Sequence, residues 1–206
     1  TMPFEKAVKY GSKLRLALIG PAGSGKTMWA LKLATYIAVS AGGRVALQDS
    51  EHRTARKYSD EFDFDTVEPD SFAPEVYIAN IHEAEKAKYP VFILDSLSHA
   101  WAGKDGILEF VDKTTEGSPS KNAYTTGWRK ATPKHNEMVE AMLACDLHLI
   151  ATLRSKTEYV MEKDEKGHSF PKKVGMQPIQ RDGLEYEFDV IADLDVDANS
   201  LVIGKT

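Results

Sequence analysis

The sequence is poor in cysteine, in long apolar runs and in net positive charge. Its only cysteine is Cys145, so no disulfide can form within the chain, which fits a reducing compartment. No apolar stretch approaches the roughly 20 residues of a membrane span, and no signal-peptide pattern opens the chain. The six histidines lack metal-ligand spacing with one another or with Cys145, which argues against a zinc site. We therefore expect a cytoplasmic protein.

The remaining composition is that of an ordinary globular protein, with 42% hydrophobic and 28% charged residues. The length of 206 residues suits one domain, which we expect to span residues 1–206. The net charge of −5 argues against a generally basic surface. Residues 121–181 nevertheless hold 11 Lys and Arg against 7 Asp and Glu, so the positive charge is concentrated in one segment. Such a cluster is either a solvated face or a surface for an anionic partner.

Residues 20–27 contain the pattern G-x-x-x-x-G-K-[ST]. An apolar run over 14–19 predicts a buried strand before it, and apolar residues at helical spacing predict a helix over 28–40. The glycines let backbone N–H groups converge on a phosphate, which the start of the helix also attracts. A glycine-rich turn before a core helix is the alternative, but the flanking elements favour a phosphate loop that binds ATP. The residues that we expect at the nucleotide are Gly20, Pro21, Ala22, Gly23, Ser24, Gly25, Lys26, Thr27 and Met28.

A second nucleotide motif follows some seventy residues later. Residues 91–94 form an apolar strand that ends in Asp95, which is the Walker B pattern. Its carboxylate and the Thr27 hydroxyl are candidate ligands of Mg²⁺, and Lys26 can reach the β- and γ-phosphates. An aspartate also occurs as a mere strand end, so the pairing with residues 20–27 carries the interpretation.

Strands and helices alternate along the chain, which predicts an α/β fold with a mostly parallel twisted sheet flanked by helices. The nucleotide would lie at the carboxyl ends of the strands. The last two strands are expected to form a C-terminal antiparallel pair. Besides those already named, we expect strands over 44–48, 147–153, 188–195 and 201–204, helices over 74–88, 105–113 and 128–144, and a basic hairpin over 157–178.

Hydrolysis of ATP needs a group that orients and deprotonates water. Many ATPases place a glutamate directly after the Walker B aspartate, but Ser96 occupies that position here. The available carboxylate is Glu51, at the end of the second strand. If that strand lies between the phosphate-loop strand and the Walker B strand, Glu51 lies beside the γ-phosphate. The alternative is a surface glutamate in a polar loop.

The segments 49–52 (DSEH) and 91–96 (VFILDS) resemble the RecA-type recombinase core. The overall pattern is more similar still to the short RecA-like ATPases of bacteriophages, the Sak-type single-strand annealing proteins. Four segments carry this resemblance, which covers most of residues 14–196: residues 20–27, 152–159 (TLRSKTEY), 173–178 (KVGMQP) and 181–189 (RDGLEYEFD).

The resemblance implies a RecA-like core with assigned roles. Lys26 and Thr27 would hold phosphate and Mg²⁺, Asp95 would assist the metal, and Glu51 would be the general base. Thr152 or Arg154 would occupy the place of the γ-phosphate sensor, although the Asn-Gln pair of RecA is absent.

Segments 114–127 and 155–175 match, in order and location, the two mobile loops with which RecA-type proteins contact DNA. Tyr124, Tyr159 and Phe170 are candidate platforms for stacking bases or packing at the loop base. Arg181 or Lys173 would be a finger acting on a neighbour's ATP, or would form a surface ion pair. The basic residues that would meet DNA phosphates are Lys121, Arg129, Lys130, Lys156, Lys163, Lys166, Lys172 and Lys173.

The two nucleotide motifs predict a Mg²⁺-dependent ATPase. The resemblance implies that it binds single-stranded DNA, that DNA stimulates its hydrolysis, and that it promotes annealing or strand exchange in phage DNA recombination. It would act in the host cytoplasm as a homo-oligomer, in a filament or ring, with a single-strand-binding protein as a further candidate partner. One alternative is a P-loop kinase for a small metabolite, with the basic 154–173 segment as its lid. Another is a nucleotide-dependent switch or loader with little turnover.

Overall fold

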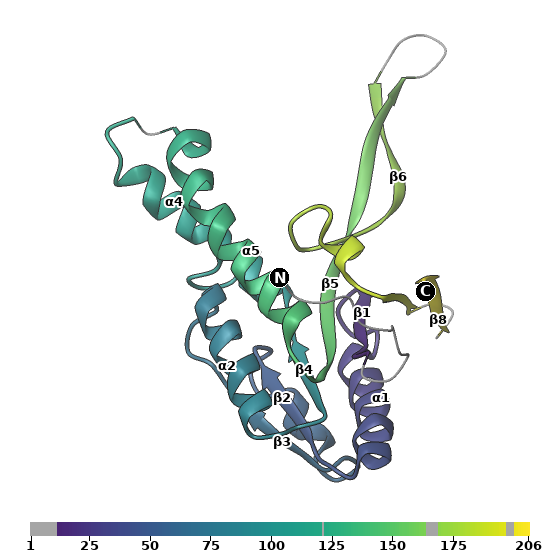
Figure 1. Ribbon diagram of the computed structural model, residues 1–206. Helices are drawn as coiled ribbons and strands as arrows, with labels where there is room; N and C mark the ends of the chain where they lie inside the picture. The colour runs from purple at the N-terminus through teal and green to yellow at the C-terminus, as the bar shows by residue number, and fades with distance from the viewer. Residues whose placement is uncertain (1–11, 121, 164–168, 197–199) are drawn as a thin grey trace, which may run out of the picture.

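The computed structural model describes residues 12–120, 122–163, 169–196 and 200–206. Its centre is a sheet with the strand order β3-β2-β4-β5-β1-β7-β8, and β6 pairs with β5 beside this path (Figure 1). The five pairings from β3 to β7 are parallel, whereas β7–β8 and β5–β6 are antiparallel. The strands are β1 (Arg15–Gly20), β2 (Val45–Asp49), β3 (Phe64–Val67), β4 (Val91–Asp95), β5 (His148–Lys163), β6 (Ser169–Pro178), β7 (Val190–Asp195) and β8 (Ser200–Lys205).

Helices cover both faces of the sheet, as Figure 1 shows with α1 on one side and α2 and α5 on the other. None of the helices in the described ranges combines the length and apolar character needed to cross a membrane. The α-helices are α1 (Lys26–Ala41), α2 (Pro74–Lys86), α3 (Ser98–Ala102), α4 (Ile107–Glu116) and α5 (Arg129–Ala144). Three short helical turns are η1 (Ala55–Tyr58), the π-helical η2 (Ala123–Trp128) and η3 (Leu184–Glu187).

The central parallel strands β1, β2 and β4 are buried on both faces because each face meets helices. In β1, Leu16 and Leu18 pack in the same core cluster as the buried residues of α1. The alternate residues Ala17 and Ile19 pack with those of α2 and α5. The α/β fold with a mostly parallel sheet and a C-terminal antiparallel pair, predicted from the sequence, is therefore confirmed.

The structure corrects the expected position of β2. The strand between β1 and β4 is β5, and β2 lies beyond β4. The predicted position of the Glu51 strand between the two nucleotide-binding strands was therefore wrong. Glu51 still follows a strand directly next to β4, so its loop begins beside the end of the Walker B strand.

The segment 114–127, which was expected to be a loop, contains regular structure, because α4 continues to Glu116 and η2 leads directly into α5. The hairpin predicted over 157–178 is confirmed: β5 continues well past the sheet and pairs with β6 from Ser155 to Lys163. This β5–β6 hairpin projects away from the sheet (Figure 1). Strand β3 and helix α3 were not predicted from the sequence.

Candidate functional site

The phosphate loop joins the end of β1 to the start of α1. Gly23 and Gly25 have φ values of 80° and 82°, a region that L side chains rarely adopt, so glycine is needed at both positions. A Cβ at Gly20 would lie 2.5 Å from Ser24 Oγ and 3.0 Å from the carbonyl oxygen of Leu194. The chain thus follows a tight path around Gly20 and enters α1 with its N–H groups at the helix start.

A buried hydroxyl oxygen and a buried lysine belong to this loop. Ser24 Oγ has no hydrogen-bond partner among the described residues. Lys26 is 8% exposed, and its Nζ donates to the carbonyl oxygens of Gly20 at 3.0 Å and Pro21 at 2.7 Å. Burial lowers the pKa of Lys26, while the negative charges of Asp95 and Glu51 oppose that shift. Both carboxylates are therefore close enough to act on the lysine.

Asp95 ends β4 and is 2% exposed. Its Oδ2 accepts a hydrogen bond from Thr27 Oγ1 at 2.7 Å, and its Oδ1 accepts one from Thr152 Oγ1 at 2.5 Å. Burial raises the pKa of Asp95, and the two hydroxyl hydrogen bonds counteract this rise. The loop threonine, the Walker B aspartate and β5 therefore meet at one point.

The residues present fit a magnesium nucleotide. Hydroxyl and carboxylate oxygens are the ligands that Mg²⁺ prefers, and Thr27 and Asp95 bring one of each together. No group of three or more His, Cys, Asp or Glu side chains suited to a metal occurs among the described residues. A metal at this point would therefore take further ligands from water and phosphate, as is usual for Mg²⁺ in nucleotide sites.

Glu51 lies across the end of β4 from Arg154. The Arg154 guanidinium donates to both carboxylate oxygens, from Nε to Oε1 at 2.7 Å and from the terminal nitrogen to Oε2. The Glu51 side chain is 17% exposed and that of Arg154 42%. This pairing is possible because β2, which Glu51 follows, and β5, which carries Arg154, flank β4 on opposite sides. It raises the pKa of Arg154.

The loop that carries Glu51 is fixed by Asp49. Asp49 is 3% exposed, and its Oδ1 accepts the backbone N–H of Glu51 at 2.7 Å while its Oδ2 accepts that of Ala55 at 3.0 Å. Between them, His52 and Arg53 adopt positive φ values of 56° and 66°. The carboxylate of Asp49 thus holds a tight turn that aims Glu51 at the site.

Sequence reasoning missed a buried polar cluster behind Glu51. Ser50 Oγ lies 2.7 Å from His99 Nδ1 and accepts the backbone N–H of Ser96 at 2.7 Å. Tyr77 donates to the carbonyl oxygen of Ser96 at 3.2 Å, and the His99 ring stacks on Phe72. Burial lowers the pKa of His99, which favours the neutral imidazole. The serines after Asp49 and Asp95 were the only signals in the sequence.

The other predicted residues lie elsewhere. Arg129 and Lys130 are exposed at the start of α5, and Lys172 and Lys173 lie in β6, whereas Lys121 falls outside the described residues. Lys156, two residues past Arg154, and Arg181 line a separate cavity with Arg129. Arg181 therefore does not belong to the cluster around Asp95. Lys166 also lies outside the described residues.

The chain is similar to one protein family and to solved structures of known proteins. Comparison with curated proteins finds no significant match. Among the solved structures that match is a KaiC-like protein from the hyperthermophilic archaeon Pyrococcus horikoshii, with 15% identity and a TM-score of 0.49 over 93% of this chain and 78% of that chain. A family model described as an AAA domain matches residues 12–206, nearly the whole chain. The protein therefore belongs to this AAA domain family of P-loop ATPases.

Proposed function

We propose that the protein hydrolyses ATP with Mg²⁺ and that single-stranded DNA stimulates this hydrolysis. One observation carries the proposal. Strand β5 holds Thr152 at Asp95 and Arg154 at Glu51, and the same strand then continues into the basic β5–β6 hairpin. A ligand on the hairpin would therefore act on the strand that positions the catalytic carboxylates.

The roles in hydrolysis follow from the geometry. The phosphate-loop N–H groups and Lys26 would bind phosphate oxygens, and Thr27 and Asp95 would hold Mg²⁺, which supplies positive charge against the phosphates. Glu51 would accept the proton of the attacking water. Both of its oxygens accept hydrogen bonds from Arg154, so the pair must open before Glu51 can act. We assign the γ-phosphate sensor to Arg154, because opening of this pair would release a guanidinium, which can bind a phosphate, beside the site.

The wider setting extends this proposal. The resemblance to Sak-type proteins supports annealing or strand exchange in phage DNA recombination, by a homo-oligomer that works beside a single-strand-binding protein. The closed Glu51–Arg154 pair also favours a second candidate, a nucleotide-dependent switch that turns over only when a partner opens the pair.

The test is steady-state MgATP hydrolysis with and without oligothymidylate, with Lys26→Ala as the blank. We expect a low basal rate that rises with single-stranded DNA and is absent in the variant. A rate that DNA leaves unchanged would contradict the proposal and favour the switch. Hydrolysis that requires a small-molecule acceptor would favour a kinase instead.

A further inference from the structure

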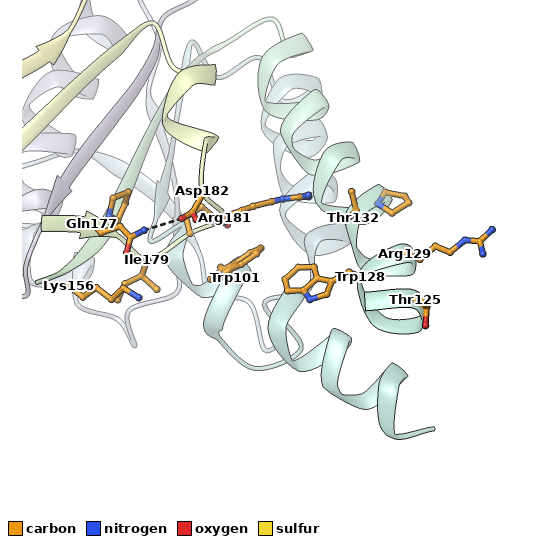
Figure 2. Close-up of a pocket in the computed structure, with 13 residues that line it drawn as sticks. Trp101, Thr125, Trp128, Arg129, Thr132, Lys156, Gln177, Ile179, Arg181 and Asp182 are labelled. Carbon is orange, nitrogen blue, oxygen red and sulfur yellow. Dashed lines mark hydrogen bonds between the residues drawn. The ribbon is translucent and has the colours of Figure 1, made fainter. Parts of the chain in front are cut away.

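A cavity of about 1060 Å³ lies apart from the phosphate loop, between α3, the start of α5 and the segment that follows β6. Figure 2 shows Trp101 and Trp128 side by side, with Arg181 extending from its loop toward the first turn of α5. On the opposite wall are Lys156 and Gln177. The cavity therefore combines aromatic and basic side chains that are distant in the sequence.

The two indoles form a supported aromatic wall. Their ring centroids lie 5.6 Å apart at an interplanar angle of 32°, and the ring of His135 meets Trp101 edge-on at 5.8 Å. Behind them lies a small apolar cluster around Ile107 and Val111, against which both indoles pack. Because both indoles remain partly exposed at the cavity, they offer a fixed surface for a flat apolar ligand.

The charge of the lining favours an anion. Arg129, Lys156 and Arg181 are cationic, and none of them forms an ion pair with a carboxylate in the described ranges, while Asp182 is the only acid in the lining. His135 adds little charge, because burial and the nearby Arg181 lower its pKa. An apolar ligand alone would not need the cations, and a bare phosphate would not need the indoles. A nucleotide unit satisfies both requirements.

We infer that this cavity holds one unstacked nucleotide of single-stranded DNA, with its base on the Trp101–Trp128 wall and its flanking phosphates at the three basic residues. The inference rests on the proposed function and specifies where and how the DNA is read. Duplex DNA is excluded from this mode because its bases remain stacked on one another.

Hydrogen bonds connect the walls of the cavity to the segments that carry Asp95 and Arg154. Gln180, which is 6% exposed, donates from Nε2 to the carbonyl oxygen of Leu97 at 3.1 Å, two residues after Asp95. The backbone N–H of Arg154 donates to Ser98 Oγ at 2.9 Å, and its carbonyl oxygen accepts the N–H of Ile179 at 2.7 Å. A nucleotide held between Trp101 and Arg181 would thus lie against the backbone that carries Asp95 and Arg154.

The test combines a change in the protein with a change in the DNA. Trp29 is replaced by Phe, so that emission comes from Trp101 and Trp128. A fifteen-nucleotide oligothymidylate should quench this emission, and an abasic oligomer of the same length and charge should not. Trp128→Leu should weaken binding of the thymidylate about tenfold or more and leave binding of the abasic oligomer unchanged. The matched control is Tyr36→Leu, which removes an exposed aromatic side chain of α1 and should change neither.

Each other outcome overturns the inference. If the unsubstituted protein binds both oligomers equally, the base makes no contact here, although the proposed function stands. If Trp128→Leu and Trp128→Phe weaken binding of the thymidylate and of the abasic oligomer equally, the base again makes no contact with Trp128, and the proposed function stands. Emission that changes with protein concentration and not with DNA would assign the cavity to a second copy of the chain. Absence of any oligonucleotide binding, by fluorescence anisotropy, would remove the DNA half of the proposed function and the inference with it.

Discussion

At the scale of single residues, the site depends on how Glu51 is held. The turn held by Asp49 directs the Glu51 carboxylate across the end of β4, where Arg154 donates hydrogen bonds to both of its oxygens. Arg154 thus has two candidate partners, Glu51 and a phosphate. Exchange between them would let Glu51 accept a proton only when a γ-phosphate is bound, which would limit wasteful turnover.

Replacing Glu51 with Gln tests the proposed base. We expect Glu51→Gln to lower kcat by about 100-fold or more, because an amide cannot accept the proton of water. ATP binding should persist, because the phosphate loop is unchanged, and a fluorescent nucleotide analogue measures it. The matched control is Glu61→Gln, an exposed glutamate in the turn after η1, which should leave kcat unchanged. Unaltered turnover in Glu51→Gln would remove Glu51 from the mechanism.

Thr152 provides a test by pH. Burial raises the pKa of Asp95, and the hydroxyl of Thr152 opposes this rise by stabilising the carboxylate. Thr152→Val removes that hydrogen bond, so the pKa of Asp95 should rise further and its charged form should be lost at a higher pH. The acidic limb of the kcat/KM profile should therefore move toward higher pH.

The control for this shift is Thr35→Val on α1. Its Oγ1 is buried and has no hydrogen-bond partner among the described residues, so the variant changes a buried hydroxyl without touching Asp95. The pH profile of Thr35→Val should coincide with that of the original protein. An acidic limb that stays in place in Thr152→Val would show that protonation of Asp95 does not set it.

At the scale of elements, Arg15 joins β1 to the end of α5. Its guanidinium donates to the carbonyl oxygens of Leu143, Cys145 and Leu147 at 2.6 to 2.9 Å, and the residue is 6% exposed. Arg15→Met would remove the guanidinium donor from these carbonyl groups, two of which it meets in buried hydrogen bonds, so we expect the free energy of unfolding to fall by about 3 kcal/mol. Urea denaturation measures it. Arg44→Met, at an exposed ion pair, should lose far less.

The β5–β6 hairpin is the element proposed to meet the DNA backbone. Replacing both Lys172 and Lys173 with Ala should weaken binding of single-stranded DNA and flatten its salt dependence, with a slope smaller by about 1.4 if each lysine meets one phosphate. Titrations of a labelled oligonucleotide at several salt concentrations measure the slope. The control replaces Lys32 on α1 and Lys86 on α2 with Ala, which removes the same charge from helices outside the hairpin. An equal loss in both variants would mean that net charge alone governs binding.

The element scale also shows how far the sequence could be interpreted. Strands β1, β2 and β4 are fully buried and mostly apolar, and their apolar runs predicted them correctly. Strand β3 and helix α3 were missed because they have only 4 and 5 residues, too few for a periodic pattern. The sequence carries no direct signal for strand order, so the predicted position of β2 between β1 and β4 was wrong. A loop was predicted over 114–127 because the small polar residues of this segment give no periodic pattern, although the segment contains the helical turn η2.

In the candidate site, too, local motifs were predicted and contacts between separate elements were not. The phosphate loop and Asp95 were predicted from local motifs, and the structure brings Thr27 to Asp95 by a hydrogen bond between residues 68 positions apart. The Glu51–Arg154 pair and the Trp101–Trp128 wall were not predicted, because each depends on contacts between separate elements. Only the fold places those partners together.

At the scale of the whole molecule, β5 connects the cluster around Asp95 with the proposed DNA site. Two ligands that bind one structure must affect each other equally, so DNA should change the affinity for an ATP analogue by the same factor as the analogue changes the affinity for DNA. We expect that factor to lie between about 5 and 150. Anisotropy of a labelled oligonucleotide with and without the analogue, and the converse titration, measure both sides of the linkage.

Arg154 is the residue through which this coupling should pass. It pairs with Glu51 in the ATP site, and its backbone is bonded to the walls of the Trp101 cavity through Ser98 and Ile179. In Arg154→Ala both ligands should still bind, because the phosphate loop and the basic cavity remain, but the linkage factor should fall toward one. Arg154→Lys keeps the charge without the two-pronged contact, so an intermediate factor there would assign the coupling to the geometry of the pair. A factor that survives in Arg154→Ala would mean that the sites communicate through α3 instead, since Trp101 lies six residues after Asp95 on the same continuous backbone.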